Sequence, residues 1–336
     1  MAPDIPIRIL VTGSRGKSSL VRLLHAAFSA CGVNTFARIT GVLPREIGPG
    51  GRERVIRRVS PIHIAEMGWW LTQVPADAEA LVMENSAVTP DLMSYAPDIL
   101  RPTLVVWTTL RPDHTELWGA TRKDAARALM RGVPHGVPVA GGPELNAPEV
   151  QPMLRANANT LHLAQGAQGA GSHQEENVNL AALAFALCAP HLDAEVARRA
   201  MLDLPPDIAD FRILEEDGDC LAAAFAANDR KSTEQLFAET GWDERETTLL
   251  YHHRLDRAAR LDDFLPWIAA RPWKDVVFSR ASRPLFSFAA GGKLSWNDGL
   301  TDPAAFRRWW KGRGKVFACG NVAGWPLQFL REDLAA

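Results

Sequence analysis

Hydrophobic positions in the first part of the chain alternate between two spacings. Residues 7–11 form an apolar run that only Arg8 interrupts, which is typical of a buried strand. Apolar residues at helical spacing follow and predict an amphipathic helix: Leu20, Leu23, Leu24, Ala27, Phe28 and Cys31. The alternation continues with strand-like runs at 34–39, 80–84, 103–109 and 138–140 and helical patterns at 62–74, 123–130 and 177–188. This order predicts an α/β fold with a doubly wound parallel sheet, in which ligands bind at the carboxyl ends of the strands.

A domain boundary is predicted at Pro205-Pro206, because consecutive prolines end helices and strands alike. It separates a first domain over residues 1–205 from a smaller C-terminal α/β domain over residues 206–336. A length of 336 residues is enough for two such domains, each with its own core. In the second domain, helical stretches separate strand-like runs at 220–225, 247–252, 275–279 and 315–319.

Charge and composition exclude several kinds of partner. The formal net charge is −2, which gives no electrostatic case for a nucleic-acid or membrane-surface partner. No apolar stretch reaches the roughly 18 residues of a membrane-spanning helix, and the chain starts almost directly on the first strand without a signal-peptide pattern. The four cysteines are far apart, which favours free thiols over disulfides or zinc ligands. We therefore expect a cytoplasmic protein.

A glycine-rich turn joins the first predicted strand to the first predicted helix, with the residues Gly13-Ser14-Arg15-Gly16-Lys17-Ser18-Ser19. Gly13 and Gly16 allow a tight turn whose N–H groups can face a phosphate at the helix N-terminus. Lys17 adds a mobile positive charge, and the hydroxyl of Ser18 is suited to Mg²⁺. The general motif G-x-x-x-x-G-K-[ST] begins with a glycine where this chain has Val11, so the alternative is a chance Gly-Lys-Ser in a loop. The order of strand, turn and helix favours a P-loop that binds ATP.

Two further residues follow predicted strands at the edge where ligands would bind. Glu84 ends the strand at 80–84, and a carboxylate beside a P-loop can hold Mg²⁺ directly or through water. Taken alone, it would be an ordinary strand-end acid facing solvent. His114 follows the strand at 103–109; its imidazole can complete a metal shell or orient phosphate, although a lone histidine is more often structural. The arginine-rich stretch 45–58 predicts a hairpin or loop, and its charges suit a solvated face or substrate binding equally.

Several short segments occur in a fixed order along residues 7–327. After the P-loop come Arg38-Ile39-Thr40-Gly41, Glu84 with Thr89-Pro90-Asp91, Arg101-Pro102-Thr103, Arg111-Pro112-Asp113-His114, Glu176-Asn177-Val178, Asn228-Asp229, Tyr251-His252-His253-Arg254-Leu255-Asp256-Arg257, and Gly320-Asn321 with Gly324. Together they resemble the Mur ligase superfamily and, within it, the ligase subunit of poly-γ-glutamate (capsule) synthases. Only the P-loop is specific by itself, and its short form is the variant of that superfamily.

The resemblance implies ATP-dependent amide-bond formation by a P-loop domain like the Mur ligase central domain and a C-terminal ligase domain. A substrate carboxylate, for example a glutamyl group, would attack ATP to give an acyl phosphate and ADP, and an amine would then displace phosphate. Lys17 would contact the β- and γ-phosphates and act in catalysis with Glu84 and His114. The implied ligands of Mg²⁺ are Ser18, Thr40, Glu84 and His114. The implied nucleotide contacts are Gly13, Ser14, Arg15, Gly16, Lys17, Ser18 and Ser19, Asn177 near the adenine, and Arg254, Asp256 and Arg257 from the second domain.

The chain also departs from the superfamily pattern. Residues 126–130 contain no lysine where many Mur ligases carry a modified one, and His252-His253 replaces a pair of asparagines. Arg38 and Arg57 offer positive charge to an amino-acid or other small carboxylate substrate. Polyglutamate ligases work with membrane partners, so the resemblance implies such partners for a polyglutamate system. The N-terminal hydrophobic segment that is usual in those ligases is missing here. Two other functions stay open: a P-loop NTPase acting as a switch or regulatory subunit, and a small-molecule kinase.

Overall fold

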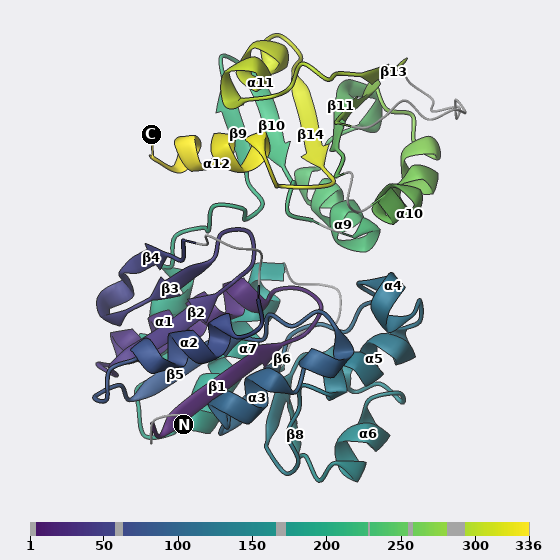
Figure 1. The fold of residues 1–336 in the computed structure, drawn as a ribbon. Coiled ribbons are helices and arrows are strands. Elements are labelled where there is room, and N and C mark those ends of the chain that lie inside the picture. The colour runs from purple at the N-terminus through teal and green to yellow at the C-terminus, as the bar shows by residue number, and fades with distance from the viewer. Residues whose placement is uncertain are drawn as a thin grey trace. The chain divides into compact units, whose positions relative to one another are not determined.

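The chain divides into two compact units, Met1–Pro205 and Pro206–Ala336. The computed structural model describes residues 5–57, 63–165, 173–227, 229–254, 258–280 and 293–335, and Figure 1 shows its elements. Each unit is an α/β structure built on its own sheet, which confirms the predicted fold class.

The first unit contains an eight-stranded sheet in the order β4-β3-β2-β5-β1-β6-β7-β8. Its strands are β1 (Ile7–Thr12), β2 (Thr35–Ile39), β3 (Arg45–Ile47), β4 (Glu53–Val55), β5 (Ala80–Glu84), β6 (Leu104–Trp107), β7 (Val139–Gly141) and β8 (Leu161–Leu163). Strands β2, β5, β1, β6, β7 and β8 run parallel, and β3 and β4 form the antiparallel hairpin within the arginine-rich stretch. The central strands are apolar throughout because both faces of the sheet are covered.

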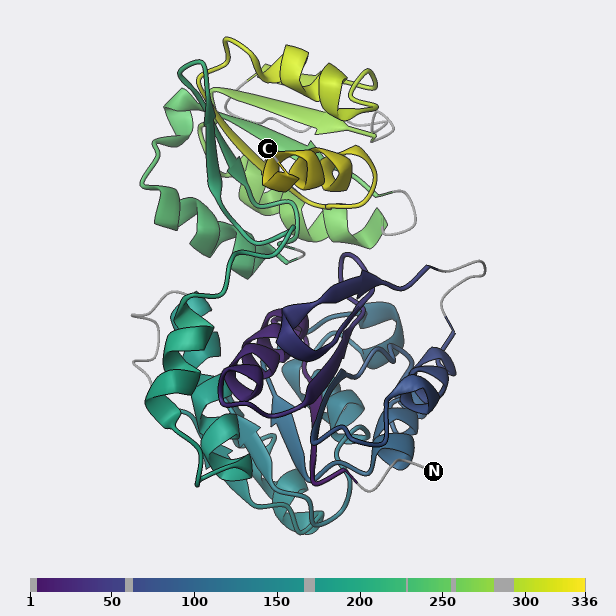
Figure 2. The ribbon, with the colours of Figure 1, turned by 90° about the vertical axis from the view of Figure 1, so that its left-hand side faces the viewer.

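Helices cover both faces of this sheet. They are α1 (Lys17–Ala30), α2 (Glu66–Gln73), α3 (Tyr95–Leu100), α4 (Thr115–Trp118), α5 (Arg122–Met130), α6 (Gln151–Ala156), α7 (His173–Cys188) and α8 (Ala194–Leu202). Helices α1, α7 and α8 share one hydrophobic core with one face, and α2, α3, α5 and α6 share another with the opposite face. Figure 2 shows α1, α7 and α8 on one side of the sheet and α2 on the other. The predicted doubly wound arrangement is therefore observed.

The second unit contains a six-stranded sheet in the order β13-β12-β11-β14-β10-β9, in which only β9 is antiparallel to its neighbour. Its elements are β9 (Ile213–Glu216), β10 (Asp219–Ala223), α9 (Arg230–Thr240), β11 (Thr247–His252), α10 (Ala258–Ala269), β12 (Asp275–Ser279), β13 (Lys293–Trp296), α11 (Pro303–Trp310), β14 (Lys315–Cys319) and α12 (Trp325–Ala335). Helices α9 and α10 pack on the sheet through Phe237, Phe264 and Ile268. Helices α11 and α12 pack on each other through a second aromatic cluster that includes Phe306 and Phe329.

Candidate active site

The P-loop lies where β1, a central strand, ends between β5 and β6. Gly13 has φ 127° and Gly16 has φ 80°, so both lie in the region of backbone conformation that favours glycine. A Cβ at Gly13 would also overlap the hydroxyl of Thr108, which follows β6. Gly16 is the N-cap residue of α1, so the free N–H groups of the first helical turn face the end of the loop. The predicted strand, turn and helix are therefore present in the geometry that binds phosphate.

Hydrogen bonds that involve side chains join the loop to the segment that follows the neighbouring strand β6. The Ser14 hydroxyl donates to the Arg111 carbonyl at 2.7 Å and accepts from the Arg111 N–H at 3.0 Å. The backbone N–H of Arg15 donates to the Thr109 hydroxyl at 2.9 Å. These bonds fix the loop before any ligand binds, which reduces the entropy that phosphate binding must overcome.

Lys17 points back over the loop that precedes it. Its ammonium donates to the Gly13 carbonyl at 2.6 Å. Burial lowers the pKa of this ammonium, the nearby Glu84 raises it, Arg15 lowers it and Asp113 raises it again. Lys17 therefore lies within electrostatic range of carboxylates from β5 and from the loop after β6.

Ser18, Glu84 and Thr40 meet at one point beside Lys17. The Ser18 hydroxyl donates to Glu84 Oε2 at 3.0 Å, and the Thr40 backbone N–H donates to the same oxygen at 2.9 Å. Glu84 is 4% exposed, and a Cβ at Gly41 would lie 2.5 Å from Ser18 Oγ. Thr40 thus reaches the cluster through its main chain. A buried carboxylate beside a serine hydroxyl is an oxygen donor set that fits Mg²⁺, and the described residues contain no group of three or more His, Cys, Asp or Glu that could hold a metal by themselves.

His114 lies on the loop after β6, next to an ion pair that the sequence did not predict. Arg15 of the P-loop pairs with Asp113 at 2.7 Å, and Asp113 Oδ1 accepts the His114 backbone N–H at 3.0 Å. Burial raises the pKa of Asp113, but the charges of Arg15 and His114 outweigh it and the net shift is downward. The imidazole is 3.7 Å from Asp113 and also 3.7 Å from Glu116, so two carboxylates lie beside it. The only sequence signal for the pair was that both residues follow strands at the ligand edge.

The remaining predicted residues lie in three different settings. Asn177 is on α7, and its amide lies about 3.2 Å from where a Cβ on Gly16 would be, so it packs against the P-loop turn. Arg254 is exposed just after β11, whereas Asp256 and Arg257 lie outside the described residues. Arg38 is 1% exposed and pairs with Glu66 at 3.2 Å, so it does not offer an open charge to a substrate; Arg57 is exposed.

The histidine that replaces an asparagine, His252, is fully buried at the end of β11. Its Nε2 is 3.1 Å from the Ala323 carbonyl, and its Nδ1 is 2.7 Å from the Ser279 hydroxyl. Because a carbonyl can only accept, Nε2 carries the proton and Nδ1 accepts from Ser279. The pKa of His252 is lowered to about 4, mainly by burial and also by Arg280 and His253, although the hydrogen bond to the Ala323 carbonyl raises it. Sequence reasoning treated this residue as a substitution of unknown effect, and the structure shows that it joins β11, β12 and the segment before α12.

Comparisons with known proteins agree with this geometry. Residues 11–135 match the family model of the Mur ligase middle domain, and residues 211–334 match that of the poly-gamma-glutamate synthase CapB C-terminal domain. PGA synthase CapB of Bacillus subtilis (strain 168) is 26% identical over 316 residues, which cover 86% of this chain and 79% of that protein. The capsule biosynthesis protein CapB of Bacillus anthracis is 25% identical over 353 residues, covering 96% of this chain and 75% of that protein.

Solved structures show the same fold. E. coli FolC in complex with ADP matches with a TM-score of 0.67 at 15% identity, covering 99% of this chain and 90% of that one. MurF from Acinetobacter baumannii matches with a TM-score of 0.66 at 15% identity, covering 97% of this chain and 76% of that one. In the part of the chain that the structure describes, no helix is long and apolar enough to cross a membrane.

Proposed function

This chain belongs to the Mur ligase superfamily, and on that premise we propose that it is an ATP-dependent ligase that joins a carboxylate to an amine. The observation that carries the proposal is the cluster of Lys17, Ser18 and Glu84 at the carboxyl end of β1 and β5. The chain also matches the CapB C-terminal domain. A simple P-loop switch does not require such a second domain, so the match favours a ligase.

The proposed reaction has two steps. An oxygen of the substrate carboxylate attacks the γ-phosphorus of ATP, the bond to the β-phosphate oxygen breaks, and ADP leaves. A neutral amine then attacks the carbonyl carbon of the acyl phosphate; it loses a proton as the carbon–oxygen bond breaks and phosphate leaves. The protein acts mainly by positioning the groups and neutralising charge.

Each residue of the cluster has a distinct task in this proposal. Lys17 exchanges its contact with the Gly13 carbonyl for the β- and γ-phosphate oxygens, and burial strengthens that charge interaction. Ser18 and Glu84 hold Mg²⁺, which when bound neutralises phosphate charge; we also propose His114 at this site. Asp113 holds Arg15 and the main chain of His114 in one arrangement, so it positions the loop after β6 relative to the P-loop.

We propose an amino acid, for example a glutamyl group, as the carboxylate substrate, because the curated relatives are named PGA synthase CapB and capsule biosynthesis protein CapB. Asn177, Arg254, Asp256 and Arg257 are proposed nucleotide contacts on the strength of the sequence resemblance. Membrane-protein partners and a cytoplasmic location belong to the same proposal.

The test is ATP turnover with a panel of amino acids and hydroxylamine as a surrogate amine. We expect hydroxamate and ADP to form together, and only when the correct acid is present. Release of AMP would mean an acyl adenylate and would contradict the mechanism. ADP without hydroxamate for every acid would favour an NTPase switch, and a stable phosphorylated product would indicate a kinase.

A further inference from the structure

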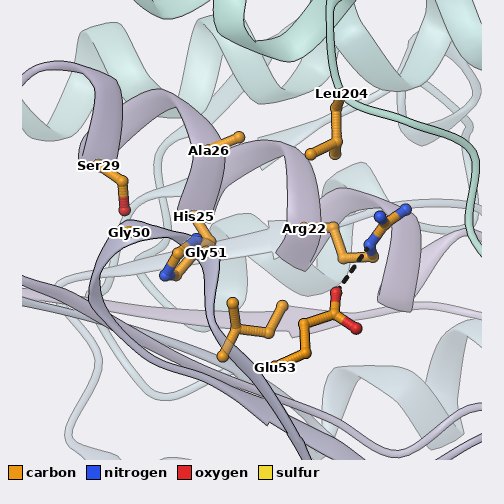
Figure 3. A pocket seen from close by; sticks show the side chains of 9 residues that line it. Arg22, His25, Ala26, Ser29, Gly50, Gly51, Glu53 and Leu204 are labelled. Carbon is orange, nitrogen blue, oxygen red and sulfur yellow. Dashed lines mark ion pairs between the residues drawn. The ribbon is translucent and has the colours of Figure 1, made fainter.

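One face of α1 carries polar residues well beyond the P-loop. Ser18, Arg22, His25 and Ser29 follow one another at intervals of four, three and four residues, so they lie in one stripe along the helix. The β3–β4 hairpin and its connecting turn lie over this stripe. Between them is a cavity of about 210 Å³ with apolar walls from Ala26, Ile47 and Leu204. Figure 3 shows that Arg22 and Ser29 project from different turns of α1.

Opposite charges face each other at one end of this cavity. Arg22 Nε is 3.6 Å from Glu53 Oε1, which is close enough for attraction but too long for a hydrogen bond. The Arg22 side chain is 9% exposed and also donates to the Pro205 carbonyl at 3.1 Å, while Glu53 additionally pairs with Arg45. Both side chains line the cavity (Figure 3), and each has hydrogen-bonding capacity beyond these contacts.

Two polar atoms farther along the stripe lack a partner. His25 Nε2 is 3.2 Å from the Thr35 carbonyl and 3.0 Å from the Gly48 carbonyl, so this nitrogen carries the proton. Burial lowers the pKa of His25, which keeps the ring neutral, and its Nδ1 then has a lone pair that no described residue satisfies. The Ser29 hydroxyl is buried and likewise has no hydrogen-bond partner among the described residues. A buried polar atom without a partner, such as the Ser29 hydroxyl, is rare because it costs free energy until something binds it.

We propose that this cavity is a second small-molecule site that binds a free α-amino acid with a hydrogen-bond donor at the end of its side chain, of the size of glutamine. A zwitterion offers a carboxylate to Arg22 and an ammonium to Glu53, whereas a simple anion would be repelled by Glu53 and a simple cation by Arg22. The side chain lies along the apolar walls, and its terminal amide donates to His25 Nδ1 and accepts from the Ser29 hydroxyl. A cavity of ~150 Å³ holds benzene, so this one suits a ligand of about eight to ten non-hydrogen atoms.

The site is connected to the P-loop by the hairpin itself. Thr40 and Gly41, which contact Glu84 and Ser18, begin the segment that continues into β3 and β4. A ligand held between α1 and Glu53 of β4 adds contacts that keep this segment against the helix. Its binding stabilises the hairpin, and it is measurable without nucleotide, so the inference does not depend on the proposed ligase activity.

The test is titration of the full chain with L-glutamine, followed by calorimetry and by the NMR signals of the His25 ring. Two matched ligands isolate the chemistry: L-glutamate lacks the terminal donor, and glutaramate lacks the ammonium. Ala26→Leu fills the cavity, and Ala30→Leu adds the same bulk at the exposed end of α1. We expect saturable binding of glutamine that Ala26→Leu weakens by about tenfold or more and Ala30→Leu leaves within about twofold, and weaker binding of both analogues.

Ser29→Ala gives an independent result if Ala26→Leu does not fold. Because the hydroxyl has no partner, its removal leaves the thermal midpoint of the free protein unchanged or higher while weakening glutamine binding about threefold or more. A structural role for the hydroxyl would lower the midpoint instead. No saturable response to glutamine, or binding that neither Ala26→Leu nor Ser29→Ala weakens, would overturn the proposal.

Discussion

The ends of central parallel strands in the two units place titratable side chains in different environments. In the first unit, this edge holds Lys17, Glu84 and Asp113, charged groups that depend on one another and are placed beside a glycine turn. In the second, the corresponding edge holds His252, a neutral side chain with both ring nitrogens bonded inside the protein. The same position in a fold can therefore serve either catalysis or the stability of the fold. The hydrogen-bond partners of a side chain distinguish these two roles.

The largest expected effect is that of Lys17→Ala on turnover. Removing the charge that contacts the transferred phosphoryl group should lower kcat by about a thousandfold or more. The thermal stability should not fall. In the absence of ligand the ammonium is buried against the Gly13 carbonyl, and that burial lowers its pKa. Kinetics and a thermal unfolding curve check both statements, with the exposed Lys123→Ala as control. Wild-type kinetics in Lys17→Ala would show that the P-loop edge does not take part in the reaction.

His252→Ala should show the reverse pattern. It removes a fully buried ring and leaves Ser279 and the Ala323 carbonyl without their partner, which should cost about 3 kcal/mol of unfolding free energy. Urea unfolding measures this loss, and the exposed His135→Ala should differ from the wild type by less than about 0.5 kcal/mol. A stable His252→Ala protein would show that this edge does not hold the second unit together.

The titration of His252 sharpens the same comparison. Its pKa falls from 6.5 in the unfolded chain to about 4 in the folded one, so only the unfolded chain takes up this proton between those values. The stabilisation is therefore fully present above pH 6.5 and is lost as the pH falls toward 4, by up to about 3 kcal/mol. Between pH 6.5 and 4, the free energy of unfolding should fall more steeply with decreasing pH in the wild type than in His252→Gln. Equal slopes would contradict the assignment.

A smaller effect is expected from Glu84→Gln, which keeps the shape of the buried side chain and removes its charge. The concentration of Mg²⁺ that half-saturates turnover should rise about tenfold, since one anionic oxygen ligand is lost. Magnesium titration of the activity checks this, with Glu195→Gln as the control because Glu195 is exposed on α8. An unchanged magnesium requirement would show that Glu84 does not bind the metal.

Much of the first unit could be predicted because local pattern and topology agree there. The P-loop is specified by adjacent residues, and Glu84 could be expected beside it because parallel strands bring their carboxyl ends to one edge. The Arg15–Asp113 pair could not, because 98 residues separate the partners and their contact depends on β6 lying next to β1. Periodicity does not determine strand order.

Burial explains the other differences. Arg38 appeared to be available for a substrate carboxylate, but β2 lies between β3 and β5, and the side chain is enclosed with Glu66. The sequence identified His252-His253 only as a replacement for a pair of asparagines, whereas the structure buries His252 between Ser279 and Ala323. In both cases the residue type was informative only once its neighbours across the sheet were known.

The central claim is that the P-loop edge transfers phosphate to a carboxylate, and isotope transfer tests it most directly. The acid that supports turnover would be prepared with ¹⁸O in its carboxylate, and the phosphate released with ADP would be analysed by mass spectrometry. An acyl phosphate predicts one ¹⁸O in each phosphate, because the amine breaks the carbon–oxygen bond and the carboxylate oxygen leaves with phosphorus. Phosphate without label would contradict the account, since its fourth oxygen would then come from water.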